Sequence, residues 1–152
     1  MSGHRMVLAA GLLCAVMVAG GPRVARADDG HCTADLLDGL YVWAASGHII
    51  PASGPAQPKA IVEWIRFNGD GTLISPGATR SLNGVIGVSP PGGPGTYSVT
   101  DLVPADRGCQ GHLTFTNGPS FDMFIPAKDG NFWMIQTDTG NVLAGVVTKV
   151  SH

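Results

Sequence analysis

Short turn dipeptides divide most of this chain into brief segments, and they limit the fold more than any other feature of the sequence. Four of them join glycine to asparagine or aspartate, at Asn68-Gly69, Asn117-Gly118, Asp129-Gly130 and Gly140-Asn141. Such pairs supply the positive φ angles that tight β-hairpins require. The segments between them are rich in valine, isoleucine, threonine, phenylalanine and tyrosine, which favour strands. The pattern predicts an all-β protein built mainly of hairpins.

Eight or nine short strands are expected, and an open sheet of that size would leave long edges unpaired. We therefore expect them to close into a single antiparallel eight-stranded barrel, with a β-sandwich as the alternative architecture. One segment, Cys32–Gly39, predicts a short helical turn that begins after Thr33 and ends at Gly39. Asn83-Gly84 is interpreted as a β-bulge, because apolar residues continue on both sides of it.

Two proline-rich segments interrupt the strand pattern. Residues 47–58 and 89–97 each hold three prolines. Proline cannot donate a hydrogen bond to a sheet ladder, so neither segment is expected to run as a central strand. Both are predicted as loops. The first is interpreted either as a functional loop at the mouth of the barrel or as a tolerated insertion.

The first 27 residues have the three parts of a secretory signal peptide. Arg5 precedes an apolar run, and the small residues Ala25 and Ala27 stand directly before an acidic segment. The apolar run is shorter than the roughly 20 residues that span a bilayer, so no retained membrane anchor is expected. Cleavage after Ala27 would leave residues 28–152 as one secreted domain, in an extracellular or periplasmic location.

The predicted cleavage site also decides how the three cysteines pair. Cys14 would leave with the signal peptide, and Cys32 and Cys109 would remain as two thiols in an oxidising compartment. We expect a disulfide between them. Because it closes a long loop, the chain-entropy model gives it an upper value of about 4 to 5 kcal/mol of stability.

Charge and motifs exclude several classes of function. Without Arg5, Arg23 and Arg26, six of the nine basic residues remain against eleven acidic ones, a net charge of −5. No basic cluster alternates with aromatic residues, so nucleic acid is not an expected partner. The sequence has no serine-hydrolase elbow, no phosphate-binding glycine loop and no paired metal-ligand spacing. Neither a cofactor nor a metal site is predicted.

Several motifs together resemble a known class of proteins. They are LLDGLYVW after an early cysteine, IRFNGDGTL, GTYSVTD, C-x-G-x-L-T and the closing IQTDTGNVLAGVVTK. With them the chain resembles small secreted bacterial proteins of the allene oxide cyclase barrel-like, calycin-type class, over about residues 32–150. The segment LVPADRG before Cys109 departs from that pattern. The resemblance implies a calycin-type barrel with a cavity, and the wider class includes cofactor-independent cyclases and isomerases that hold an apolar substrate.

Glu63 is the only glutamate of the chain and the main candidate for chemistry. Strand alternation places it on one face with Ile61, Ile65 and Phe67, but the sequence leaves open which face turns inward. An inward Glu63 would be a lone carboxylate among apolar side chains, with a pKa raised toward general acid or base use. An outward Glu63 would be a solvated charge on the barrel wall.

These observations yield one set of predicted site residues and two classes of function. If a pocket exists, Glu63 is the predicted catalytic residue. Ile65 and Phe67 are predicted ligand contacts beside it, with Tyr41 and Tyr97 near the mouth. The predicted function is binding of a small apolar molecule, or a role as a secreted structural or interaction factor. The alternative is a cofactor-free isomerase or cyclase that uses Glu63 and a tyrosine. The oligomeric state is left open, a homo-oligomer included.

Overall fold

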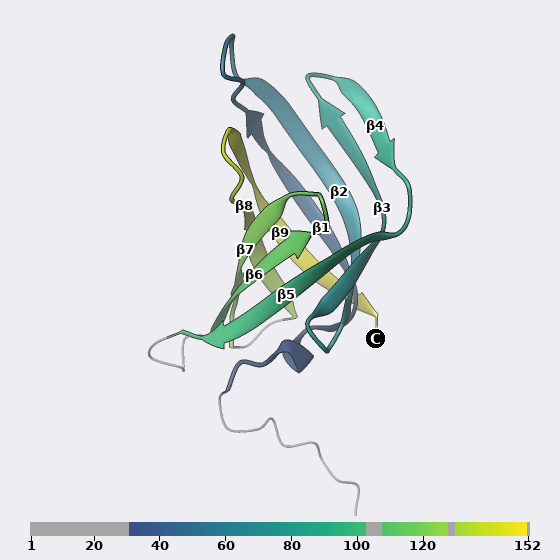
Figure 1. Ribbon diagram of the computed structural model, residues 1–152, viewed down its shortest axis with the longest axis vertical. Coiled ribbons are helices and arrows are strands. Elements are labelled where there is room, and N and C mark those ends of the chain that lie inside the picture. The colour runs from purple at the N-terminus through teal and green to yellow at the C-terminus, as the bar shows by residue number, and fades with distance from the viewer. Residues whose placement is uncertain (1–30, 103–107, 128–129, 152) are drawn as a thin grey trace, which may run out of the picture.

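The strands form one continuous antiparallel sheet. The computed structural model describes residues 31–102, 108–127 and 130–151. Within these ranges lie one 3-10 turn, η1, and nine strands (Figure 1). The element bounds are η1 Ala34–Leu36, β1 Asp38–Ile49, β2 Gln57–Asn68, β3 Thr72–Leu82, β4 Val85–Ser89, β5 Gly93–Asp101, β6 Cys109–Phe115, β7 Ser120–Ile125, β8 Asn131–Gln136 and β9 Asn141–Ser151.

Pairing between β2 and β3 closes the sheet into a barrel. The strand order is β2-β1-β9-β8-β7-β6-β5-β3, and β2 also pairs with β3. These eight strands form a closed antiparallel barrel, and β4 is an additional strand that pairs with β3. The predicted eight-stranded barrel is therefore confirmed. The alternative of two packed sheets is excluded, because a single sheet closes on itself.

Strand β3 changes partner about halfway along its length. Residues 72–75 pair with β5, whereas residues 78–82 pair with β4. At the change, Ser75 and Pro76 together lie opposite Ile65 of β2, which makes a β-bulge. A bulge leaves one residue out of the ladder, so it tolerates a proline that has no N–H to donate. Beyond the bulge, β2, β3 and β4 extend past β5, β6 and β7 at one end of the barrel (Figure 1).

Apart from one end, the barrel interior is filled with packed apolar side chains. Trp43, Phe67 and Phe121 are among the side chains that are fully buried in it. Two aromatic pairs meet edge to face with ring centroids 4.9 Å apart, Phe67 with Tyr97 and Trp43 with Phe121. Such pairs add about 0.5 to 1.5 kcal/mol to the stability that comes from burial alone. This part of the barrel is a close-packed hydrophobic core.

The segment that carries η1 covers the packed end and is held there by a hydrogen bond and a disulfide. The Tyr97 hydroxyl lies 2.7 Å from the carbonyl oxygen of Ala34 and 2.9 Å from that of Leu37, and donates its proton between them. Cys32 and Cys109 form the predicted disulfide, with Cα atoms 5.8 Å apart.

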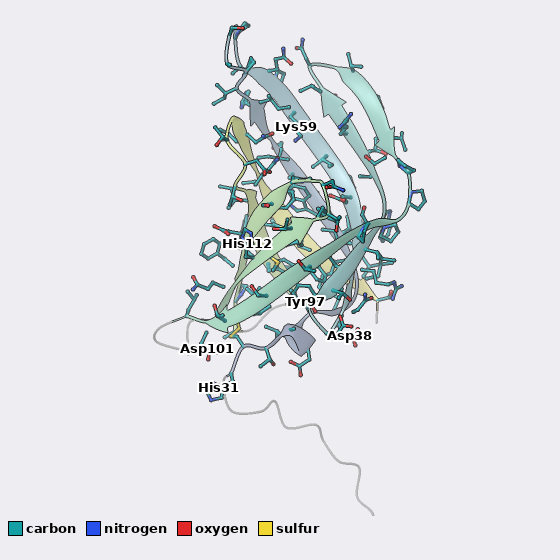
Figure 2. All side chains as sticks on the ribbon, viewed as in Figure 1. His31, Asp38, Lys59, Tyr97, Asp101 and His112 are labelled. Carbon is teal, nitrogen blue, oxygen red and sulfur yellow. A yellow bond between two sulfur atoms is a disulfide. The ribbon has the colours of Figure 1, made fainter. Side chains whose placement is uncertain are left out.

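Asp101 reinforces this attachment by binding the backbone beside the disulfide. Its carboxylate accepts a hydrogen bond from the Cys32 backbone N–H at 2.6 Å and lies 3.1 Å from His31 Nδ1. The hydrogen bond from the Cys32 N–H lowers the pKa of the Asp101 carboxyl most, and the contact with His31 lowers it further. Figure 2 shows His31 and Asp101 close together at this end, with Tyr97 nearby.

Two turn predictions need correction. Asn83-Gly84 is the two-residue turn between β3 and β4, with φ angles of 50° and 82°, and the predicted bulge at this dipeptide is wrong. The apolar residues on its two sides belong to different strands of one hairpin. The helical turn ends at Leu36, earlier than the predicted Gly39, and Thr33 makes no side-chain cap to it.

The proline-rich segments are shorter loops than predicted. Pro58 lies in β2 opposite His48, and Pro94 lies in β5 opposite Ile74. Both positions are near a strand end, and each proline takes part in the sheet through its carbonyl group. Asn83 N–H donates to the Pro58 oxygen, and Thr116 N–H donates to the Pro94 oxygen, each at 2.8 Å.

Some predictions fall on residues that the structure does not describe. The signal peptide, residues 1–27, and the turn residue Asp129 belong to this group. In the ranges that are described, no helix has the length and hydropathy needed to cross a membrane.

The disulfide gives the first testable prediction. It closes a sequence separation of 77 residues, so the variant with both Cys32→Ser and Cys109→Ser should lose up to about 4 to 5 kcal/mol of unfolding free energy. Urea denaturation of oxidised wild type, reduced wild type and the variant measures this loss. Reduced wild type should behave like the variant. Equal stability of all three samples would contradict the role given to the disulfide.

The two tyrosines of the chain give a matched pair of variants. Tyr97→Phe removes the donor to the Leu37 carbonyl group and leaves Ala34 O with only the Leu37 backbone N–H, so it should lower the unfolding free energy by about 1 to 2 kcal/mol. Tyr41→Phe removes the same atom from a ring that is also buried, but among the described residues that hydroxyl makes no hydrogen bond, so its loss should cost less than about 0.5 kcal/mol. Chemical denaturation distinguishes them, and equal losses would show that the tie to η1 contributes nothing.

Candidate functional site

A cavity of about 530 Å³ opens at the end of the barrel away from η1. Its walls come from β2, β3, β8 and the turns that follow β4, β6 and β8. We call this cavity the cup. In Figure 2, Lys59 lies toward the cup end and Tyr97 near the other end. Three polar residues are buried in the described ranges, namely Glu63, Ser75 and Gln136, and all three line the cup.

Glu63 faces inward from β2 and is only 8% exposed. Its strand alternates, so the neighbours Val62 and Trp64 turn outward. Burial raises the pKa of the Glu63 carboxyl above its ordinary value of 4.5. The Ser75 hydroxyl and the positive charge of Lys59 offset part of that rise. The result is a carboxyl group that holds its proton more readily than a solvent-exposed glutamate does.

The bulge in β3 places two of the side chains around Glu63. In a regular strand, Ser75 and Gly77 would point the same way and Ala78 would point outward. The extra residue at Pro76 restores Ala78 to the inner side, so that Ser75 and Ala78 are both buried. Ala78 lies directly opposite Glu63 in the β2–β3 ladder. Its small side chain leaves space next to the carboxyl group.

A chain of polar contacts crosses the cup from β2 to β8. Lys59 Nζ donates to Gln136 Oε1 at 3.2 Å, and Gln136 Nε2 donates to Asp138 Oδ2 at 2.7 Å. The Ser120 backbone N–H donates to the same Asp138 oxygen at 3.1 Å. These contacts fix the orientation of the Gln136 amide. Burial lowers the pKa of Lys59 below its ordinary value, and the nearby charge of Arg80 lowers it further.

The interior also holds a buried donor with nothing to bind. Trp43 lies opposite Glu63 in the β1–β2 ladder and is fully buried. Among the described residues, its indole Nε1–H finds no hydrogen-bond acceptor. An unsatisfied buried donor costs about 1 to 3 kcal/mol, which a buried water or the oxygen of a bound molecule can recover. Strand β1, next to Glu63, therefore carries a buried N–H group that has no hydrogen-bond partner among the described residues.

The predicted ligand contacts lie elsewhere in the barrel. Ile65 and Phe67 continue the inward face of β2 below Glu63 and are covered by the core. Tyr41 packs on Phe67 with ring centroids 5.3 Å apart, and Tyr97 binds the η1 segment. The structure therefore brings these four residues together around Phe67, and none of them lines the cup. Their role in ligand binding stays a prediction.

Sequence analysis missed several cup residues, and strand alternation could have located only some of them. Alternation along β8 places Gln136 on the same face as Phe132 and Met134, so its position was readable from the sequence. Ser75 was not readable, because its direction depends on the bulge at Pro76. Asp138 lies in a turn, where alternation gives no direction.

A second polar group lies on the outer wall of the barrel, away from the cup. His112 Nδ1 is 2.9 Å from Asp122 Oδ1, and its Nε2 is 3.2 Å from Thr114 Oγ1. The His112 and Asp122 side chains are half exposed, so this is a solvent-facing ladder of cross-strand contacts. In the described ranges, no group of three or more His, Cys, Asp or Glu side chains is arranged to hold a metal ion.

Comparisons of the chain with protein-family models, with curated proteins and with solved structures found no match.

Replacing Glu63 with glutamine tests its burial. The folded pKa lies above the unfolded one, so the contribution of this group to stability is full below about pH 4.5 and is lost as pH rises through the folded pKa. We expect the unfolding free energy of wild type, measured relative to Glu63→Gln, to fall between about pH 4 and pH 8. Each pH unit by which the pKa is raised corresponds to about 1.4 kcal/mol.

Ser75→Ala supplies the matched control for this titration. The Ser75 hydroxyl lowers the pKa of Glu63, so its removal should move the fall in stability to higher pH. Urea denaturation of the three proteins across the pH range measures both effects. A constant difference between wild type and Glu63→Gln at every pH would mean that the carboxyl group is solvated in solution.

Proposed function

We propose that this protein is a secreted binding protein that holds one small amphipathic molecule in the cup. The observation that carries the proposal is the gathering of the buried polar residues Glu63, Ser75 and Gln136 around a single cavity. Burying polar groups is unfavourable unless they are paired, and scattered positions would be expected if they served packing alone. Their convergence at the open end of a packed barrel is typical of a ligand site.

The lining of the cup defines the chemistry of the ligand. Ile61, Phe115 and Pro119 offer apolar surface, while Glu63, Ser75 and Gln136 offer hydrogen-bonding groups deeper in the barrel. The fitting molecule has an apolar part and at least one hydroxyl, amide or carbonyl group. A volume of about 530 Å³ lies within the range of about 300 to 1,000 Å³ that small-molecule sites occupy.

Secretion and class membership belong to the same proposal. The disulfide between Cys32 and Cys109 supports an oxidising compartment, and the N-terminal sequence supports cleavage after Ala27. The resemblance to allene oxide cyclase barrel-like proteins of calycin type supports a barrel that encloses a ligand. Intact mass of the protein recovered from culture fluid tests the cleavage site directly.

A second candidate function is a cofactor-free isomerase or cyclase, and the raised pKa of Glu63 favours it. Glu63 would take a proton from the substrate and return it elsewhere, while Lys59 and Gln136 orient polar groups. Tyr41 and Tyr97 lie outside the cup, so the tyrosine of the sequence-based hypothesis has no place in this version. Glu63→Gln would then keep binding and lose turnover about 10²- to 10⁴-fold.

Native mass spectrometry of the protein secreted by its own organism tests the binding proposal. We expect a small molecule to be retained by wild type and lost from Ala78→Phe, because the larger side chain fills the space opposite Glu63. Thr96→Phe is the matched control, since it adds a ring on the exposed outer face of β5. The affinity for the recovered molecule should fall at least about tenfold only in Ala78→Phe.

Two outcomes would contradict the binding proposal. One is equal retention of the molecule by wild type and Ala78→Phe. The other is the absence of any retained molecule, combined with no detectable binding of short-chain alcohols, amides and carboxylic acids by calorimetry.

A further inference from the structure

Two basic side chains are neighbours on the inner wall of the cup. Lys59 of β2 and Arg80 of β3 both line it. In the β2–β3 ladder, Arg80 lies opposite Ile61, two residues along β2 from Lys59, so the two basic residues are diagonal neighbours on one face. Such neighbours lie about 7 to 8 Å apart, within reach of long side chains. The rim of the cup therefore carries a pair of cations.

A glycine on β4 leaves room for the Arg80 side chain. Alternation from the buried Ala78 places Arg80 on the inner side of β3, where it lies opposite Gly87 of β4. A Cβ atom at Gly87 would stand 3.0 Å from Arg80 Nε, a closer approach than most side chains allow. The φ angle of Gly87 lies outside the positive range that favours glycine. The absence of a side chain at Gly87 therefore lets Arg80 lie against β4 at the rim.

Neither cation has an anionic partner in the part of the chain that the structure describes. The only salt bridges among the described residues are made by His31 and His112. Lys59 donates to the neutral amide oxygen of Gln136, and Arg80 carries five N–H donors. Burial lowers the pKa of Lys59 most, and the charge of Arg80 lowers it further. An anion between the two side chains would relieve their repulsion.

The charges that line the cup favour a ligand with one negative charge. Besides the two cations, the charged lining residues are Glu63 and Asp138. Burial raises the pKa of the Glu63 carboxyl, and with Glu63 protonated the lining has a net charge of +1. The planar guanidinium group of Arg80 can bind both oxygens of a carboxylate at once. A carboxylate thus fits both the charge and the donors at the rim.

We propose that the ligand of the cup is an organic carboxylate whose anionic group binds Lys59 and Arg80 at the rim. This inference rests on the proposed binding function. Glu63 is four residues from Lys59 on the same face of β2, about 13 Å along the strand, and Ile61 lies between them. The apolar part of the ligand passes Ile61, and its far end approaches Glu63. This separation keeps the ligand carboxylate away from the Glu63 carboxyl.

Isothermal titration calorimetry of the disulfide-bonded protein with phenylpropanoate, phenylpropanamide and phenylpropanol tests the inference. These molecules share one apolar part, and at about pH 6 only the first is charged. Wild type should bind the carboxylate at least about tenfold more tightly than the amide. Lys59→Gln and Arg80→Gln should each weaken carboxylate binding at least about fivefold and leave amide binding unchanged. Lys149→Gln is the matched control, because it removes the same charge beside Tyr41, away from the cup.

Gly87→Val tests the position of the Arg80 side chain without a change of charge. Its added carbon atoms occupy the space next to Arg80 Nε. Carboxylate binding should fall about as far as in Arg80→Gln, and amide binding should not change. Gly77→Val is the control, because it adds the same side chain to β3 where the atom nearest to a Cβ is 3.7 Å away. It should leave the binding of both molecules unchanged.

Three results would overturn the inference. Equal binding of the carboxylate and the amide by wild type would do so, and would leave the proposed binding function standing. A preference for the carboxylate that persists in both Lys59→Gln and Arg80→Gln would also overturn it. Binding of none of the three molecules would count against the inference and the proposed binding function together. Amide binding by each variant shows that its cup is folded.

Discussion

The ladder between β2 and β3 is the contact on which both the barrel and the cup depend. This ladder closes the eight-stranded sheet into a barrel. At its bulge, Ser75 and Pro76, the partner of β3 changes from β5 to β4. The same bulge directs Ser75 and Ala78 inward next to Glu63. One irregularity in the pairing therefore opens the wall of the barrel at one end and equips the opening with polar and small side chains.

The two ends of the barrel differ in what their interiors contain. Around Phe67 the interior is filled by aromatic and aliphatic side chains, and the disulfide and Tyr97 hold the η1 segment over it. At the other end, Glu63 is kept from water at a cost that its neighbours Ser75 and Lys59 only partly offset. A stable barrel does not need a buried carboxyl group, and the proposed ligand site would give this cost a reason.

Much of the fold was predictable because turn chemistry and strand alternation are local properties. The turn at Asn68-Gly69, the all-β class, barrel closure and the cysteine pairing all followed from residue types and their order. The direction of Glu63 did not, because both faces of its strand carry apolar residues. The cup could not be assembled from sequence either, since Ser75 reaches it through a bulge and Lys59 meets Gln136 across the barrel.

The central claim is that Glu63 lies buried in the cup in solution, and NMR titration of its carboxyl carbon tests this most directly. Because Glu63 is the only glutamate of the chain, labelling with glutamate enriched in ¹³C at Cδ gives one side-chain signal that needs no further assignment. The structure predicts a titration midpoint above the ordinary value of 4.5, moved higher again by Ser75→Ala. A midpoint at or below 4.5, unchanged in that variant, would contradict it.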